Sequence, residues 1–277
     1  MPFAEANGAE LWYETVGDGP TIVLTPGGLQ HGHEVFDPVV GGLSHGHQVV
    51  TYDRRFAGRS RSPLVVQTWD QMVDDLIGLM DALDIERADL GGGATGGAIS
   101  LRAAARYPAR VRSVAMVNVN GGLICTALLM MPLIMSMEIA ERQGMDAFIE
   151  AFDPAGRYAP FVPPQAAEDP AYRSALGAMP THDFAEIMRE TIRELFDGSY
   201  VGIALTEALL AQVRAPVLIM HGPGDDVHPR AVALAVRERL ARSQWADVAS
   251  FRRPADRDLY VSTVRGFLAD VGAGAGQ

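Results

Sequence analysis

Short apolar runs alternate with longer helical patterns along this chain. Residues Thr21–Thr25 (TIVLT) form a continuous apolar run, which is typical of a strand buried on both faces of a sheet. Residues Asp70–Leu83 carry apolar side chains at helical spacing. Strands and helices that alternate in this way predict a parallel sheet flanked by helices. The other predicted strands are Glu10–Thr15, Gln48–Tyr52, Ala88–Leu90, Ser113–Asn118, Pro216–His221 and Asp247–Phe251, and the other core helices are Ala98–Tyr107, Val232–Arg242 and Asp258–Leu268.

Nearly a hundred residues separate the predicted strand that ends at Asn118 from the one that begins at Pro216. An unstructured connection of this length is uncommon in a compact domain, so the interval predicts an inserted helical lid. We expect residues 121–206 to form the lid, and residues 1–120 and 207–277 to form the core.

The lid interval is rich in methionine, with seven of the twelve in the chain. Methionine side chains adapt to irregular apolar pockets, although most of these are expected to fill the lid's own core. We expect a minority, with Met130 and Met131 as the candidates, to contact a small hydrophobic substrate.

The chain is acidic, with a formal net charge of −11 and an isoelectric point near 5.0. This charge disfavours nucleic acid and anionic membranes as partners, because both attract a basic surface. The most apolar run, residues 121–137, is interrupted by Pro132, so we expect no membrane-spanning segment. The single cysteine, Cys125, excludes an internal disulfide, and a chain without disulfides favours the reducing cytoplasm as its location. A homodimer is compatible with these features.

Lysine is absent from the sequence, and all 23 basic residues are arginines. Schiff-base chemistry on a lysine, including that of pyridoxal phosphate, is therefore excluded. The histidines lack a recognisable metal-binding spacing, and the sequence has no phosphate-binding glycine loop. We expect neither a metal nor an organic cofactor.

Three segments carry a resemblance to a known family. The segment from Ala88, ADLGGGATGGAISLRAAARYPARVRSVAMVN, resembles the nucleophile-elbow region of α/β-hydrolases. TYDRRFAGRSRSP is similar to that superfamily's YDxRGxGxSxxP loop, and PVLIMHGPGDDVHP looks like the stretch that carries its catalytic acid. The resemblance covers nearly the whole chain and implies an α/β-hydrolase fold, with a mostly parallel eight-stranded sheet flanked by helices and an inserted helical lid. The fold alone does not fix the function.

The resemblance places Ala94 where the family carries its nucleophile. A sharp strand-to-helix turn needs small neighbours, which the glycines at positions 92, 96 and 97 supply. A methyl group cannot attack a carbonyl carbon. A frame shifted by one residue would make Thr95 the nucleophile, but the ungapped match through Pro108 and Arg110 argues against that shift.

The acid position is retained in the resemblance, and the base position is not. Asp225 stands where the family carries its acid, although aspartate is also a common turn residue. The family's histidine base follows the last strand, where this chain reads RRPADRDLY and places Asp256 or Arg257. His228 is the last histidine, so a Ser-His-Asp mechanism lacks its nucleophile and its base. If Arg257 occupies the base position, an Asp225–Arg257 ion pair is the expected replacement.

We expect the backbone donors of an oxyanion hole to persist. Thr95 follows the nucleophile position and contributes one N–H group. Gly28 or Leu29, in the turn after strand Thr21–Thr25, contributes the second. The usual His-Gly of that turn is Pro26–Gly27 here, which is a departure from the family pattern.

The sequence leaves a short set of polar side chains for chemistry. His31 and His33 follow the oxyanion turn, and a role as acid or base is as compatible with this position as a merely hydrogen-bonded one. Asn118 and Asn120 follow a central strand, where the ligands of open sheets bind. His228 is a weaker candidate for substrate contact, because it can equally begin the following helix.

Three classes of function fit these residues. The first is a cofactor-free, non-hydrolytic enzyme, such as a cyclase, isomerase, lyase or decarboxylase, that acts on a small hydrophobic carbonyl compound such as a polyketide-like intermediate. It would use the oxyanion hole for an enolate and a pocket residue for proton transfer. The second is an ester or C–C bond hydrolase with an unusual nucleophile, Thr95 or Cys125, or an activated water. The third is an inactive ligand-binding protein. We favour the first, because the tight glycine turn persists around Ala94.

Overall fold

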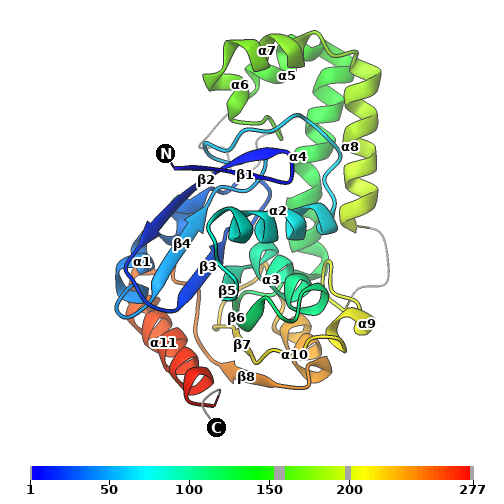
Figure 1. Cartoon of the computed structure of the whole chain (residues 1–277). Helices are drawn as coiled ribbons and strands as arrows, with labels where there is room; N and C mark the ends of the chain where they lie inside the picture. Colours follow the sequence, from blue (N-terminus) through cyan, green and yellow to red (C-terminus); the bar gives the residue numbers. More distant parts are fainter. Residues whose placement is uncertain (1, 153–159, 197–200, 275–277) are drawn as a thin grey trace.

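A computed structural model describes residues 2–152, 160–196 and 201–274. Its centre is an eight-stranded sheet in the order β1-β2-β4-β3-β5-β6-β7-β8, with helices on both faces (Figure 1). Strands β3 to β8 pair in parallel, and β1 and β2 are antiparallel at one edge. The mostly parallel eight-stranded sheet is therefore confirmed. The strands are β1 Phe3–Ala6, β2 Ala9–Val16, β3 Thr21–Thr25, β4 Gln48–Tyr52, β5 Ala88–Gly93, β6 Val111–Val117, β7 Val217–Met220 and β8 Ser243–Ala246.

Each face of the sheet buries its own apolar cluster. One cluster joins the sheet to helices α2, α3 and α10 and continues into the lid, and the other joins it to α1 and α11. The helices of the core are α1 Asp37–Leu43, α2 Trp69–Ala82, α3 Thr95–Arg106, α9 Glu207–Leu210, α10 Arg230–Arg239 and α11 Arg257–Gly274, with short 3₁₀ turns η1 His33–Phe36 and η2 Pro254–Asp256.

The last strand lies four residues before its predicted place. The prediction of Asp247–Phe251 is wrong, because β7 pairs with Ser243–Ala246. This edge strand is only half-buried, and its Trp245 lies beneath the guanidinium groups of Arg230 and Arg237. Its sequence therefore lacks the apolar run by which a buried strand is found. Strand β1, which pairs with β2, has no counterpart among the predicted strands.

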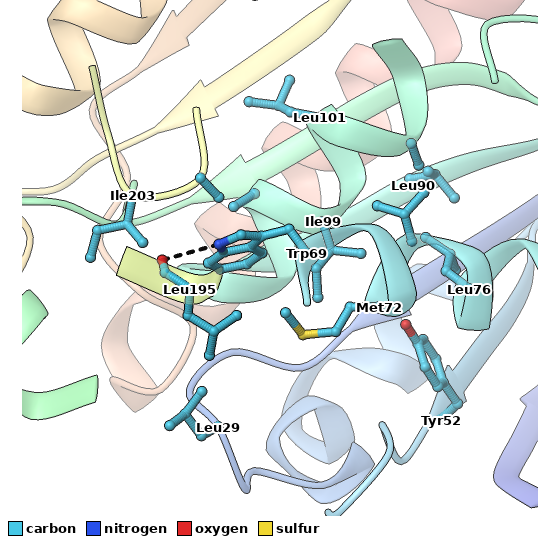
Figure 2. Packing of buried hydrophobic residues seen from close by; sticks show 14 of the residues in the cluster. Leu29, Tyr52, Trp69, Met72, Leu76, Leu90, Ile99, Leu101, Leu195 and Ile203 are labelled. Carbon is cyan, nitrogen blue, oxygen red and sulfur yellow. Dashed lines mark hydrogen bonds between the residues drawn. The ribbon is translucent and has the colours of Figure 1, made fainter. Parts of the chain in front are cut away.

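The helices of the predicted lid gather at one end of the molecule, beyond the carboxyl ends of the central strands (Figure 1). They are α4 Gly122–Gln143, α5 Met145–Glu150, α6 Gln165–Glu168, α7 Pro170–Gly177 and α8 Thr181–Phe196. Two hydrogen bonds tie them to the segment before α2, from the Ser62 N–H to Gln165 Oε1 and from the Gln67 N–H to Thr191 Oγ1. A third joins the buried indole of Trp69, the first residue of α2, to the Leu195 carbonyl (Figure 2). The exact boundaries of lid and core stay a prediction.

Helix α4 departs from the expectation that no segment is long enough to span a membrane. By length and composition alone it qualifies, with a mean hydropathy of 2.0 in its most apolar window. Pro132 does not break the run, because it lies inside α4, where its carbonyl accepts the Ser136 hydroxyl and the Phe161 N–H. Only 22% of that window is buried, although α4 lies against α5 and α8.

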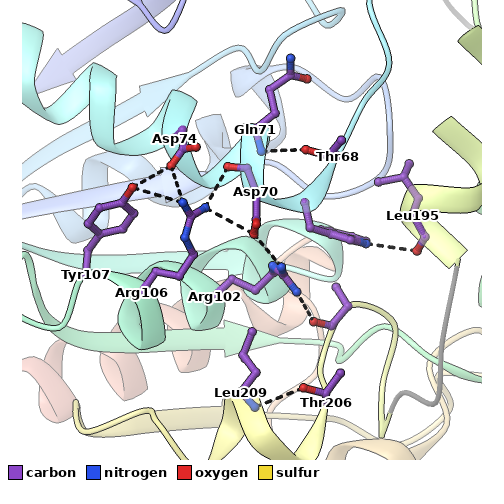
Figure 3. A network of polar contacts seen from close by, with 12 residues as sticks. Thr68, Asp70, Gln71, Asp74, Arg102, Arg106, Tyr107, Leu195, Thr206 and Leu209 are labelled. Carbon is purple, nitrogen blue, oxygen red and sulfur yellow. Dashed lines mark hydrogen bonds and ion pairs between the residues drawn. The ribbon is translucent and has the colours of Figure 1, made fainter. Parts of the chain in front are cut away.

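A surface network of charges joins α2 to α3. Asp70 accepts from Arg102 at 2.7 Å and pairs with Arg106 at 3.3 Å, while Asp74 accepts from the Tyr107 hydroxyl at 2.8 Å (Figure 3). Arg102 also donates to the Ala204 carbonyl. These contacts fix α3, the helix that begins at the elbow, against its neighbours.

Candidate active site

The strand-to-helix elbow keeps its tight geometry although its tip is an alanine. Ala94 lies between β5 and α3 with φ 53° and ψ −114°, a region that residues with a Cβ rarely occupy. The Ala94 N–H is held by the Val117 carbonyl at 3.0 Å. A Cβ on Gly96 would lie 1.9 Å from the Thr25 carbonyl oxygen, so the chain can pass there only as glycine.

The turn after β3 lies beside this tip, as an oxyanion hole requires. A Cβ built on Gly27 would be 3.5 Å from the Ala94 Cβ. Helix α3 begins at Thr95, whose N–H is among the first donors that an α-helix leaves without an intrahelical partner. The Thr95 hydroxyl accepts from the Asn120 amide at 3.0 Å, which fixes its side chain. Gly28 and the buried Leu29 follow Gly27 in this turn.

Asp225 holds a histidine, but from its own turn. Its Oδ2 lies 2.9 Å from His228 Nδ1, and its Oδ1 accepts the N–H groups of Val227 and His228 at 3.0 and 2.9 Å. The His228 carbonyl in turn lies 2.8 Å from Nε2 of the buried His221 at the end of β7. Because a carboxylate accepts only N–H donors, His228 carries its proton on Nδ1 in the neutral form, which leaves Nε2 with a lone pair.

The surroundings favour that neutral imidazole. Burial lowers the pKa of His228, against the opposing effect of the Asp225 charge and hydrogen bond. The charge of Arg252 lowers this pKa further. Burial raises the pKa of the Asp225 carboxyl, yet the His228 contacts and the Val227 N–H outweigh it, and the net pKa lies below its ordinary value. At neutral pH the pair is therefore an aspartate and an uncharged histidine.

The predicted Asp225–Arg257 ion pair is wrong. Arg257 begins α11 and donates to the Phe251 carbonyl at 3.3 Å, whereas Asp225 is satisfied by His228. The loop after β8, where the family carries its base, instead presents Arg252 and Arg253. Arg253 donates to the Gly224 carbonyl at 3.4 Å, beside Asp225.

His31 and His33, predicted as an equivalent pair, have different places. His31 packs over Gly28, where a Cβ would lie 2.8 Å from His31 Nδ1, and that nitrogen is 3.1 Å from Arg252 Nη2. His33 instead contacts Asp53, with Nδ1 2.8 Å from Oδ1. Its ring packs on the Trp12 ring, and the two ring centroids are 4.0 Å apart. The structure therefore places His31 at the oxyanion turn and His33 in the anchor of the loop that follows.

The two asparagines have different surroundings, and Asn118 borders a cavity beside Asp225. It has φ 58° at the end of β6 and lines a cavity of about 260 Å³ together with Asp225 and Arg253. Asn120 is buried, and its amide is engaged with Thr95 and with the Cys125 thiol at 3.4 Å.

Cys125 and the two candidate methionines all lie on α4, but they differ in burial. Burial raises the pKa of Cys125, and the nearby Asp225 charge adds to that effect, so the thiol is a poor nucleophile. Met130 is half-buried, and Met131 is 40% exposed on the outer side of α4. Contact of either methionine with substrate stays a prediction.

One group within the described part of the chain has the composition of a metal site. His33, Glu34 and Asp53 bring three ligand atoms within 4.8 Å of one another. The two Asp53 oxygens already accept the N–H groups of His33 and Arg59, at 2.7 and 2.8 Å. These contacts explain the group as an anchor of the loop without an ion.

Comparison with known proteins agrees with this geometry. The family model of the alpha/beta hydrolase fold matches residues 20–249. The chain belongs to this family. The fold prediction is thereby confirmed, while the family itself contains many chemistries.

The relatives of this α/β-hydrolase-fold protein are named as hydrolases. The 2-hydroxymuconate semialdehyde hydrolase of Pseudomonas sp. (strain CF600) is 28% identical over 252 residues, 82% of this chain and 78% of that protein. An enol-lactonase from Burkholderia xenovorans LB400 has a TM-score of 0.66 at 25% identity and covers 97% of this chain and all of its own. A protein of Azorhizobium caulinodans with the provisional name carbamate hydrolase RutD is 33% identical over 118 residues, and this chain spans only 44% of its length.

Sequence reasoning underrated His228. The spacing Asp225-x-x-His228 places the two side chains together whenever the aspartate accepts the N–H groups that open a turn, as it does here. The sequence carries this signal as DDVH, separated by three residues from the predicted strand Pro216–His221.

Proposed function

We propose that this protein is a cofactor-free, non-hydrolytic enzyme that moves a proton next to a carbonyl group, with His228 as its general base. The observation that carries the proposal is the 2.9 Å contact between Asp225 Oδ2 and His228 Nδ1. A histidine held by an aspartate through Nδ1 has Nε2 free for a substrate, as in a catalytic triad, although here the histidine comes from the turn of the aspartate itself. Here the nucleophile position is Ala94, so no covalent acyl-enzyme can form there.

The chemistry follows from the remaining groups. A substrate carbonyl oxygen accepts the N–H groups of Thr95 and Leu29, which stabilise the negative charge of an enolate. The proton on the adjacent carbon passes to His228 Nε2, and Asp225 stabilises the imidazolium that forms. Return of the proton to another carbon gives an isomer. Attack of the enolate on a second carbonyl gives a cyclised product.

The composition of the site supports a small, apolar substrate class. Helix α4 begins a few residues after strand β6 ends and is mostly aliphatic, and contact of Met130 or Met131 with the substrate is part of the proposal. A polyketide-like carbonyl compound has this character. A cytoplasmic location, the absence of a membrane partner and a homodimer also remain part of the proposal.

A second function has a specific observation in its favour. The relatives are named as hydrolases, and a neutral His228 could also deprotonate a water molecule for direct attack on a carbonyl at the oxyanion hole. This route leads to an ester, lactone or C–C bond hydrolase without an enzyme-bound intermediate.

Exchange of α-protons for deuterium separates the two functions. We expect the protein to accelerate exchange into an apolar ketone, with 2-tetralone as the probe in D₂O, followed by NMR. His228→Gln should lower the catalysed rate by about 10²–10⁴-fold, the usual contribution of a general base. His182→Gln, on the exposed surface of the lid, is the matched control and should retain the rate.

Each outcome decides between the three classes. Turnover of short p-nitrophenyl esters that depends on His228, without exchange, would replace the proposal with water-mediated hydrolysis. Exchange and hydrolysis both at the buffer rate, over a panel of ketones and esters, would reject catalysis at this site and leave the ligand-binding class.

A further inference from the structure

The segment after β4 contains a buried arginine that contacts the turn after β3. Arg54 is 3% exposed, and its Nη2 donates to the Gly28 carbonyl and, at 3.2 Å, to the Gly27 carbonyl. Its Nη1 lies 3.5 Å from the Met72 sulfur. The guanidinium thus donates its shortest hydrogen bonds to two successive peptide groups of the oxyanion turn.

No carboxylate neutralises this arginine among the ion pairs of residues 2–152, 160–196 and 201–274. Its neighbour Arg55 shows the usual solution, because it is equally buried and pairs with Asp75 at 2.7 Å. Burial lowers the pKa of Arg54 to about 10, so the side chain still carries its charge at neutral pH. Burial of a cation costs free energy unless an opposite charge or hydrogen bonds compensate for the lost water.

The contacts of Arg54 determine which way the backbone donors point. In a planar trans peptide the carbonyl and the following N–H point in opposite directions. When the Gly27 and Gly28 carbonyls face Arg54, the N–H groups of Gly28 and Leu29 face the other way. Gly28 has φ 63°, and a left-handed residue of this kind brings successive N–H groups to one side of a turn.

The neighbours of the turn identify its surroundings on the side away from Arg54. Gly27 borders the Ala94 methyl group, and His31 covers Gly28. The turn borders the elbow at Gly27, and an oxyanion hole needs the N–H groups directed away from Arg54 to face that elbow, where the Thr95 N–H begins helix α3. A positive charge behind both peptide groups also polarises them, which strengthens their N–H donors toward a developing anion.

We propose that Arg54 is the positioning residue of the oxyanion hole: it fixes and polarises the Gly27–Gly28 and Gly28–Leu29 peptide groups so that their N–H groups bind a substrate oxyanion. The inference rests on the proposed function, because it assumes that the hole binds an anionic oxygen. Arg54 touches no reacting atom, and it acts through the backbone.

Binding of 4-nitrophenol tests this role without any turnover. The protein should bind the phenolate in preference to the phenol, measured from the phenolate absorbance over a pH titration. Arg54→Gln removes the charge and the donors to both carbonyls, and this preference should fall about tenfold. Arg54→Lys restores the charge and one donor, and it should recover part of the preference.

The adjacent arginine supplies the matched control. Arg55→Gln breaks a buried ion pair and should lower the melting temperature at least as much as Arg54→Gln, yet it should leave the phenolate preference unchanged. If Arg54→Gln does not fold, Arg54→Lys carries the comparison, with a preference below that of the wild type.

Three results would overturn the inference. They are no phenolate preference in the wild type, a wild-type preference in the folded Arg54 variants, and an equal loss in Arg55→Gln. A loss confined to the Arg54 variants, in a protein that gives no α-proton exchange with ketones, would keep this inference and reject the proposed proton transfer.

Discussion

Ala94 shows that a nucleophile elbow can keep its shape without a nucleophile. The φ of 53° is left-handed, and residues held in such regions cost about 1–3 kcal/mol each. The surrounding glycines leave the backbone no other path, because a Cβ on Gly92 or Gly96 would collide with the Thr25 carbonyl. The strain is therefore a consequence of the turn itself, and the turn keeps the Thr95 N–H at the head of α3.

Replacement of this residue by glycine measures the strain. Ala94→Gly removes the Cβ penalty and should raise the free energy of unfolding by about 1 kcal/mol, read from urea denaturation. Ala98→Gly, one turn later inside the same helix, should lower it by about 1 kcal/mol. If both variants lose stability equally, residue 94 is not strained.

A serine at the same position tests how the base is used. Ala94→Ser restores a hydroxyl, but the proposal assigns His228 Nε2 to the substrate carbon and not to residue 94, and the loop after β8 carries Arg252 and Arg253 where the family has its histidine. We expect p-nitrophenyl acetate hydrolysis to stay at the buffer rate. Robust esterase activity would show that His228 reaches residue 94 and serves it as a base, which would bring the protein close to its hydrolase relatives.

At the scale of elements, hydrogen bonds from the segment that leads into α2 help to attach the predicted lid, beside the apolar cluster that continues into it. The Trp69 indole donates to the Leu195 carbonyl at 3.1 Å in a buried position, at the junction of α2 and α8 (Figure 2). Trp69→Phe leaves that carbonyl without its donor, so unfolding should become easier by about 1–3 kcal/mol, and the lid should be cut sooner by a protease.

The other end of the sheet provides the control for this variant. Trp245 donates to Asp247 at 3.1 Å on an exposed surface, so Trp245→Phe should cost less stability and leave the lid's protease resistance unchanged. A loss of lid protection in Trp245→Phe, or none in Trp69→Phe, would contradict the role of this tether.

The sequence predicted the elements that bury an apolar run, and it failed where burial is partial. Strand β3 begins and ends at the predicted residues, because its centre, Ile22 to Leu24, is apolar and the strand is buried almost entirely. Strand β8 was misplaced because its residues are half-exposed. The elbow glycines were recognisable from spacing, whereas the pairing of Asp225 with His228 depends on a turn geometry that the apolar pattern does not encode.

At the scale of the whole molecule, His228 links the site to the stability of the protein. Its pKa is lower when folded than the ordinary value of 6.5, so the unfolded chain binds more protons between these two values. The histidine therefore stabilises the fold fully above pH 6.5, and this contribution is lost as the pH falls toward the folded pKa.

The comparison with a variant that cannot titrate isolates this effect. His228→Gln removes the titrating group, so the difference in unfolding free energy, wild type minus variant, should become smaller as the pH falls from 7.5 through about 6.5. Urea denaturation across that pH range measures it. A constant or growing difference would contradict a lowered pKa.

The most direct test is an NMR titration of His228 in protein labelled with ¹⁵N-histidine, with its signals assigned from His228→Gln. The lone pair on Nε2 is the property on which proton transfer depends. We predict a neutral imidazole with its proton on Nδ1 at pH 7 and a pKa below the ordinary value of 6.5. A proton on Nε2 at neutral pH would mean that His228 lacks the lone pair that the proposed proton transfer needs, and a pKa above 6.5 would contradict the lowered pKa of this account.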